Sequence, residues 1–194
     1  SRVVTAAAGP FEELSRLRPD SVTERVLGLD SQLQSHLVDS DQLHEQARAF
    51  MLELAEAPTY RGNVYASVKR AEAAARERLE LASLVRSYAD LKRQLGYVEF
   101  SDQMAAAARI ATKVGQVAEQ LRDQYQVVLL DEYQDTSAAQ ALLLKGLFSG
   151  SDPEHGLGHP VTAVGDPFQA IYGWRGAAAS NILAFPEEFP HVDG

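Results

Sequence analysis

The sequence of 194 residues contains no cysteine, so disulfide bonds and thiolate metal sites are excluded. It also lacks any apolar run near the roughly 20 residues of a membrane span, and its first apolar stretch is too short for a signal peptide. We therefore expect a cytoplasmic protein without membrane contact. Two of the five histidines, His155 and His159, lie in a stretch rich in glycine and proline rather than on one helical face. No histidine metal site is predicted from this arrangement.

A surplus of positive charge is missing as well. The formal net charge is −9, which is the wrong sign for a protein that binds DNA through an overall basic surface. Residues 61–93 nevertheless hold eight basic side chains against four acidic ones. This basic segment is either a solvated helix with i,i+4 ion pairs or a face that meets phosphate, and both interpretations stay open. Its basic residues are Arg61, Lys69, Arg70, Arg76, Arg78, Arg86, Lys92 and Arg93.

Hydrophobic residues make up 45% of the chain, enough to bury one ordinary core or two small ones. In the first half, apolar residues recur at spacings of three and four, which predicts amphipathic helices and an all-helical unit over residues 1–96. The capping-box pattern that begins at Ser21 predicts the first helix start, and Gly96 is the expected left-handed residue after the last. The helices are expected from Ser21 to about Leu37, from about Asp41 to before Pro58, and from about Val64 to Leu95.

The second half has an α/β pattern. A helix is expected from Ser101 to about Gln124, and the unbroken apolar run Val127–Leu130 that follows is typical of a strand buried on both faces of a parallel sheet. Thr136 or Ser137 should cap a short helix, and Val161–Val164 should form a second strand.

Two acids, Asp131 and Glu132, follow the first of these strands directly. In open α/β sheets, ligands bind at the edge where parallel strands end. One carboxylate there can hold Mg²⁺, and the next can take a proton from an attacking water. The second strand leads into Gly165-Asp166-Pro167, and the segment from Gln169 to Arg175 then offers an amide, two aromatics and an arginine. That mixture suits a γ-phosphate on one side and nucleotide bases on the other.

The run DEYQDT at residues 131–136, together with GDPFQAIYGWRGA at residues 165–177, resembles motifs II and III of superfamily 1 DNA helicases of the UvrD/Rep type. The resemblance covers roughly residues 98–183. Pro167, Phe168 and Ala170 depart from the usual UvrD form of motif III. With these residues the motif looks more like that of helicase–nuclease motor subunits, so the branch of the family stays open.

The resemblance implies an α/β fold in which residues 1–96 form a helical 1B-like subdomain and residues 97–194 form part of the RecA-like domain 1A. It also implies that residues 126–131 and 160–165 pair as parallel neighbours. No glycine is followed by lysine and then by serine or threonine, so the P-loop and its strand are absent from this sequence. We therefore expect the chain alone to hydrolyse no ATP.

On the nucleotide side, the resemblance implies ATP and Mg²⁺ as cofactors. Asp131 would hold Mg²⁺, and Glu132 would orient and deprotonate the attacking water. Gln169 matches the motif III glutamine that senses the γ-phosphate. Arg175 matches the motif III arginine, which lies between the nucleotide and DNA sites.

On the DNA side, the resemblance implies that Tyr172 and Trp174 stack on single-stranded bases beside Arg175. The implied function is part of an ATP-dependent DNA helicase that moves on single-stranded DNA from 3′ to 5′, with duplex DNA and the remaining helicase domains as partners. Two alternatives stay open. The parent protein could be the motor subunit of a helicase–nuclease that resects DNA ends, or the chain could be a non-catalytic DNA-binding or docking module without a P-loop.

Overall fold

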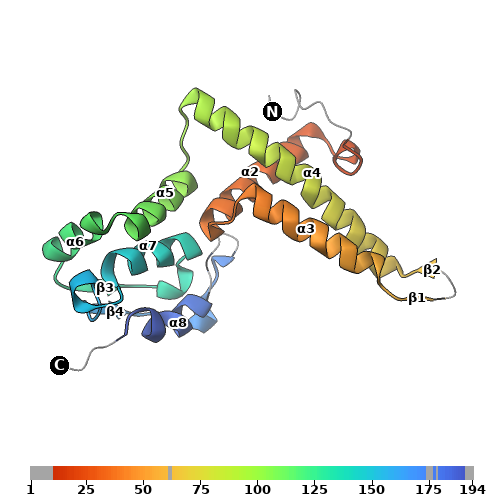
Figure 1. Cartoon of the computed structure of the whole chain (residues 1–194). Helices are drawn as coiled ribbons and strands as arrows, with labels where there is room; N and C mark the ends of the chain where they lie inside the picture. The colour runs from red at the N-terminus through yellow and green to blue at the C-terminus, as the bar shows by residue number, and fades with distance from the viewer. Residues whose placement is uncertain (1–10, 61–62, 174–176, 178, 191–194) are drawn as a thin grey trace. The chain divides into compact units, whose positions relative to one another are not determined.

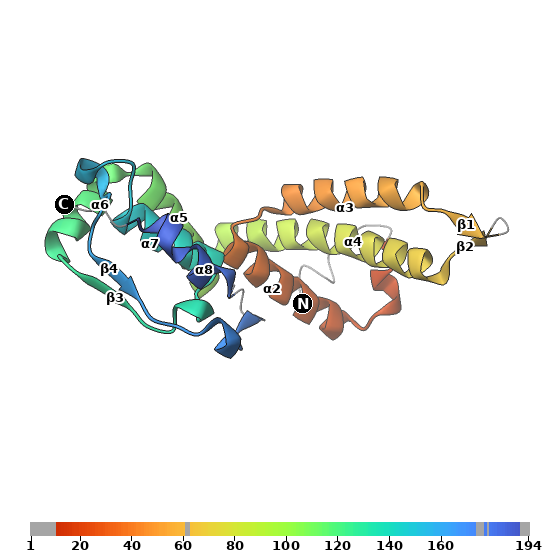
Figure 2. The same cartoon turned by 90° about the horizontal axis from the view of Figure 1, so that it is seen from below.

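A computed structural model describes residues 11–60, 63–173, 177 and 179–190 (Figures 1 and 2). The chain divides into two units. Unit 1 comprises Ser1–Leu33 and Val38–Val98, and unit 2 comprises Gln34–Leu37 and Glu99–Gly194. Each unit contains its own set of packed helices.

Unit 1 is built on three helices, and α3 packs along α4 (Figure 2). The helices are α2 (Pro19–His36), α3 (Ser40–Ala55) and α4 (Ala66–Leu95). The core forms where apolar residues of α2 and α4 meet, together with Leu14 from a preceding 3-10 turn. The carboxylate of Glu80 on α4 anchors that turn by accepting hydrogen bonds from consecutive backbone N–H groups, at 2.7 Å from Glu12 and 2.8 Å from Leu14. The buried core residues are Leu14, Val22, Val26, Leu33, Leu81, Leu84 and Val85.

The ends of these helices test the expected boundaries. Gly96 has φ 68° and ends α4, as predicted, because a left-handed residue lets the chain leave the helix without a Cβ clash. The start of α2 was predicted wrongly at Ser21. The helix begins at Pro19, whose fixed φ suits the first helical position, and the Thr23 hydroxyl donates a hydrogen bond to the Pro19 carbonyl one turn back.

Unit 1 is not entirely helical, which corrects the prediction for residues 1–96. A short antiparallel hairpin joins α3 to α4, with β1 (Thr59–Tyr60) paired to β2 (Asn63–Val64). Strands of two residues are too short to produce an alternating pattern of apolar and polar residues, so the sequence carried no periodic signal for them.

Unit 2 contains four helices in its described part, α5 (Phe100–Lys113), α6 (Gly115–Gln124), α7 (Ala138–Phe148) and α8 (Ser180–Glu188). Both α5 and α6 pack against α7. The single helix expected from Ser101 to Gln124 was wrong, because the chain breaks at Val114 (φ −120°, ψ 84°) and starts again at Gly115. Ser137 caps α7 as one of the two expected residues, and its side chain accepts a hydrogen bond from the Gln140 N–H group.

Two strands of unit 2, β3 (Val128–Leu130) and β4 (Val161–Ala163), pair in parallel with Leu129 opposite Thr162 (Figure 2). This pairing confirms the expected adjacency of the two strands. The expectation that the first strand is buried on both faces is wrong for this chain, since the Leu129 side chain is 76% exposed. The reason is that Leu129 and Thr162 lie on a sheet face that the described residues leave open to solvent.

Within the described residues, none of the helices combines the length and the apolar character that crossing a membrane requires.

Candidate nucleotide and DNA site

The two sequence motifs meet where β3 and β4 end. Asp131 and Glu132 follow β3 and lead into the 3-10 turn Tyr133–Asp135, while Gly165 and Asp166 follow β4. Backbone hydrogen bonds continue the pairing past the strands, at 2.8 Å from the Val164 N–H group to the Leu130 carbonyl and 3.0 Å from the Tyr133 N–H group to the Val164 carbonyl. Parallel pairing therefore brings both turns to one edge of the sheet, where the sequence predicted a ligand site.

The two acids of the first turn are exposed and held by their backbone. Glu132 has φ 51° and ψ 41°, a left-handed conformation that costs a residue other than glycine on the order of 1–2 kcal/mol. Asp131 offsets part of this cost because its Oδ1 atom accepts a hydrogen bond from the Glu132 N–H group at 2.9 Å. Strained residues of this kind are found preferentially at functional sites.

Gln134 links the two turns. Its side chain is 1% exposed, and its Oε1 atom accepts a hydrogen bond from the Asp166 N–H group at 3.0 Å. Its Nε2 atom donates to the Glu132 carboxylate at 2.5 Å. The same buried amide therefore holds the carboxylate that follows one strand and the backbone that follows the other.

Asp166 holds Gln169 in the second turn. The Asp166 carboxylate accepts hydrogen bonds from the Gln169 side-chain amide and from the Phe168 N–H group, both at 2.9 Å. These two bonds, that from Gln169 first, lower the pKa of the Asp166 carboxyl below its ordinary value. Gln169 is exposed and its amide is thus positioned by a charged partner.

Sequence reasoning placed Asp166 at the sheet edge but assigned no role to it. The available signal was an aspartate followed by proline and, three residues later, by glutamine, a pattern typical of a side chain that caps a turn. Gln134 ties motif II to the turn that follows β4 through its two hydrogen bonds.

Of the residues expected to meet DNA, Tyr172 is described and its side chain is 39% exposed. Trp174 and Arg175 lie outside the described residues. Two apolar side chains precede Tyr172 in the same segment and are more exposed still, Phe168 at 97% and Ile171 at 70%. The segment therefore presents apolar surface to solvent beside the polar turn.

The described residues contain no cluster of three or more histidine or acidic side chains that would bind a metal ion without help. A single carboxylate such as that of Asp131 is enough for the kind of Mg²⁺ site found with nucleotides. There the ion takes one or two carboxylates, and phosphate oxygens and water fill its other positions. A magnesium site here would therefore depend on the nucleotide.

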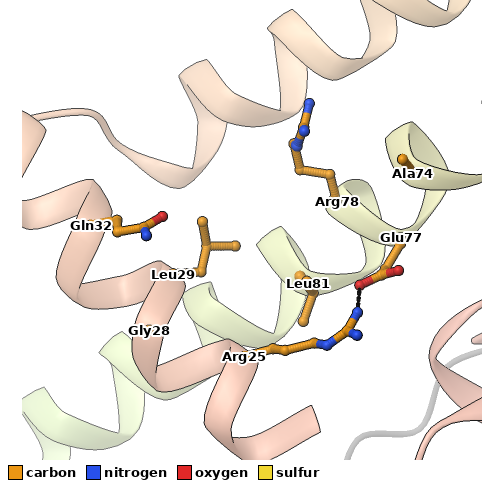
Figure 3. Close-up of a pocket in the computed structure, with 8 residues that line it drawn as sticks. All are labelled: Arg25, Gly28, Leu29, Gln32, Ala74, Glu77, Arg78 and Leu81. Carbon is orange, nitrogen blue, oxygen red and sulfur yellow. Dashed lines mark hydrogen bonds and ion pairs between the residues drawn. The ribbon is translucent and has the colours of Figure 1, made fainter. Parts of the chain in front are cut away.

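Unit 1 has a separate groove of about 430 Å³ between α2 and α4 (Figure 3). Leu29 and Leu81 supply apolar surface, and Arg25 forms an ion pair with Glu77. Figure 3 shows the guanidinium of Arg78 pointing away from that pair, and no acidic side chain among the described residues pairs with it. Arg78 also lines a second cavity, beside α3.

Ion pairs neutralise part of the basic segment. Arg76 pairs with Glu72, and Lys92 pairs with Asp30 inside the unit. Lys69 and Arg70 are exposed, and the described part of the chain gives neither an acidic partner. The interpretation as a helix with ion pairs therefore fits Arg76 and Lys92, while Lys69 and Arg70 stay compatible with the interpretation as a face that meets phosphate. Arg76 also pairs with Glu12 at 3.6 Å, and the other pairs join Arg86 to Asp41 and Arg93 to Asp90.

Comparison with known proteins agrees with the two motifs. Residues 12–190 match the model of the UvrD/REP helicase N-terminal domain. The chain is 35% identical over 109 residues to the ATP-dependent DNA helicase PcrA of Staphylococcus aureus strain Mu50, covering 55% of the chain and 14% of that protein. It is 34% identical over 108 residues to PcrA of Staphylococcus epidermidis, covering 54% and 14%. The matched part of the chain thus spans about one seventh of these relatives. Neither the helicase–nuclease nor the non-catalytic alternative is favoured by these comparisons.

Proposed function

The chain belongs to the UvrD/REP helicase family by its match to that family's N-terminal domain, and on this premise we propose that it is the motif II and III part of a longer ATP-dependent DNA helicase. The observation that carries the proposal is the meeting of Asp131, Glu132 and the turn that holds Gln169 at one edge of a parallel sheet. The P-loop would come from elsewhere in the full-length protein, because these 194 residues contain none.

Each side chain of this edge has a role in the proposed hydrolysis. Asp131 would hold Mg²⁺, which neutralises phosphate charge when it is bound. Glu132 would accept a proton from the attacking water, and its exposed carboxylate can be reached from solvent. Gln169 would sense the γ-phosphate, for which its amide must exchange the Asp166 carboxylate for a phosphate oxygen. Arg175 would lie between this site and the DNA.

The proposed DNA contact uses the segment that follows the second turn. Tyr172 and Trp174 would stack on successive bases of single-stranded DNA, and stacking accepts any base because each one has a π-face. The exposed apolar surface of this segment supports the assignment. Movement from 3′ to 5′ and the RecA-like arrangement of the complete sheet are parts of the same proposal.

The proposal is tested by Glu132→Gln in the full-length protein. We expect ATP binding to persist while kcat for DNA-stimulated ATP hydrolysis falls by about 10²–10⁴, the usual worth of a positioned general base. Glu119→Gln on α6 is the matched control, since Glu119 is exposed and lies outside both motifs. Near-normal turnover in Glu132→Gln would remove this residue from the mechanism, and no hydrolysis by the unaltered full-length protein would refute the function itself.

A further inference from the structure

The buried amide of Gln134 supports an inference that rests on the proposed function. Gln134 is too deep to meet substrate, with 1% of its side chain exposed. A buried amide normally satisfies its donor and acceptor within the protein, often to nearby backbone. Here the donor is used on the carboxylate proposed to activate water, and the acceptor on the backbone of the opposite turn.

Only one orientation of this amide satisfies both neighbours. The Asp166 N–H group can only donate, so it must face Oε1. The Glu132 carboxylate, when ionised, can only accept, so it must face Nε2. The two partners therefore fix the amide, and the amide in turn fixes the distance between them.

Gly165 leaves room for this contact. A Cβ atom on residue 165 would overlap Gln134 Oε1 and lie 2.7 Å from Ile182 Cδ1 on α8. The absence of a side chain lets the backbone after β4 approach the amide closely enough for the Asp166 hydrogen bond. Glycine is thus required here for close approach rather than for an unusual φ.

The hydrogen bonds form one continuous path. Glu132 accepts from Gln134, Gln134 accepts from the Asp166 N–H group, and the Asp166 carboxylate accepts from Gln169. A movement of the Gln169 turn, which nucleotide or DNA would cause by touching it, must therefore move Gln134 or break its hydrogen bond.

We propose that Gln134 is a positioning residue that aligns the Glu132 carboxylate with the turn carrying Gln169, so that water activation depends on where that turn lies. Gln134 acts through Glu132 and touches no reacting atom. A residue of this kind affects kcat while leaving nucleotide affinity nearly unchanged.

Two substitutions separate its functions. Gln134→Met keeps the length of the side chain and removes both hydrogen bonds. Gln134→Glu keeps an acceptor for the Asp166 N–H group but loses the donor to Glu132. In the full-length protein we expect both variants to lose kcat by on the order of 10- to 100-fold, the worth of a hydrogen bond to a charged group, with KM for ATP changed by less than about twofold.

The pH dependence distinguishes positioning from simple support of the fold. Burial and the neighbouring Glu132 carboxylate both disfavour charge on the carboxyl introduced by Gln134→Glu, so it should take up a proton between about pH 5 and 8. Once protonated, it can donate to Glu132 again. We expect kcat of Gln134→Glu relative to the unaltered protein to rise as pH falls through this range, and that of Gln134→Met to stay constant.

Hydrogen exchange of the Asp166 amide and the melting temperature complete the test. Exchange should stay slow in Gln134→Glu and become faster in Gln134→Met, since only the former keeps the acceptor. The proposal would be overturned if Gln134→Glu lost kcat equally at every pH and only to the extent that its melting temperature fell. Normal turnover in both variants would overturn it as well. If Gln134→Met does not fold, the pH series of Gln134→Glu decides alone.

Glu132→Gln, measured in parallel, separates the two levels of inference. If Glu132→Gln is inactive while both Gln134 variants turn over normally, only the positioning role is wrong. If Glu132→Gln is fully active, the proposed role of Glu132 is wrong and the positioning role is overturned with it.

Discussion

Tyr133 carries a hydroxyl group into the interior of unit 2, where the described residues offer it no hydrogen-bond partner. Its side chain is 1% exposed, and its ring meets Phe185 of α8 edge-on at a centroid distance of 5.3 Å. Burial, with a smaller contribution from Glu188, raises the pKa of the hydroxyl to about 12. A buried donor without a partner loses its hydration without compensation, which costs on the order of 1–3 kcal/mol.

Tyr133→Phe should therefore raise the free energy of unfolding at neutral pH by about 1 kcal/mol, because it keeps the ring packing and removes the unsatisfied hydroxyl. The substitution should also change how the free energy of unfolding depends on pH under alkaline conditions. The folded pKa lies above the unfolded value near 10, so the unfolded chain releases its proton first and stability falls between roughly pH 10 and 12. Tyr133→Phe has no hydroxyl to titrate, so it should lack the part of this loss of stability that Tyr133 causes.

Urea unfolding as a function of pH measures both effects. Tyr97→Phe is the matched control, since Tyr97 is 69% exposed and should show neither. A lower stability of Tyr133→Phe at neutral pH would mean that the hydroxyl is satisfied in solution, by water or by residues outside the described part of the chain.

At the scale of elements, α2 and α4 are joined by an ion pair inside unit 1. Asp30 and Lys92 approach to 2.5 Å, and their side chains are 1% and 7% exposed. The Lys92 ammonium also lies 4.9 Å from the centre of the Tyr88 ring. Both charges have left water, so the loss of either one leaves the other charge buried with less compensation.

Asp30→Leu or Lys92→Met alone should lower the free energy of unfolding by about 3–5 kcal/mol. The double variant should cost less than either single one, because two apolar side chains replace two desolvated charges. Asp90→Asn, which breaks the exposed pair with Arg93, is the control and should change stability by less than about 1 kcal/mol. If the losses of the two single variants added up in the double variant, the buried charge left behind would not be the cause of the loss in stability.

The elements differ in how far their sequences could predict them. Helices with a local stop signal were placed well, as the left-handed Gly96 shows. The break at Val114 was not predicted because apolar spacing continues through it, although Gly115 follows directly and weakens the helix there. The parallel neighbours β3 and β4 were expected from the resemblance, while the exposure of Leu129 was not, since burial depends on what covers the sheet.

The same distinction applies to the site. Motif spacing was enough to bring Asp131, Glu132 and the Gln169 turn to one edge, because parallel strands place their ends together. The path through Gln134 depends on side-chain orientation and on the close backbone approach at Gly165. Neither of these is a property of residue spacing, so the link could not be worked out before the structure.

At the scale of the whole molecule, the charge is acidic overall and basic in one segment of α4. The net charge of −9 disfavours contact with DNA through a general field, so the proposed DNA binding would have to use local groups. Seven of the eight basic residues of the segment lie in the described part of the chain, and four of these seven are engaged in ion pairs. Lys69 and Arg70 are exposed, and the described residues hold no acid paired with either.

This difference gives a matched experiment. In the full-length protein, Lys69→Gln with Arg70→Gln should lower the slope of log affinity for duplex DNA against log salt concentration, by about 0.9 for each phosphate that is no longer neutralised. Arg86→Gln with Arg93→Gln removes the same charge from the same helix, but those side chains already face Asp41 and Asp90, so the slope should stay unchanged. Fluorescence anisotropy at several salt concentrations measures both variants. Equal changes of the slope in the two double variants would mean that α4 acts on DNA only through its total charge. An unchanged slope in both would mean that the basic segment faces solvent and does not contact DNA.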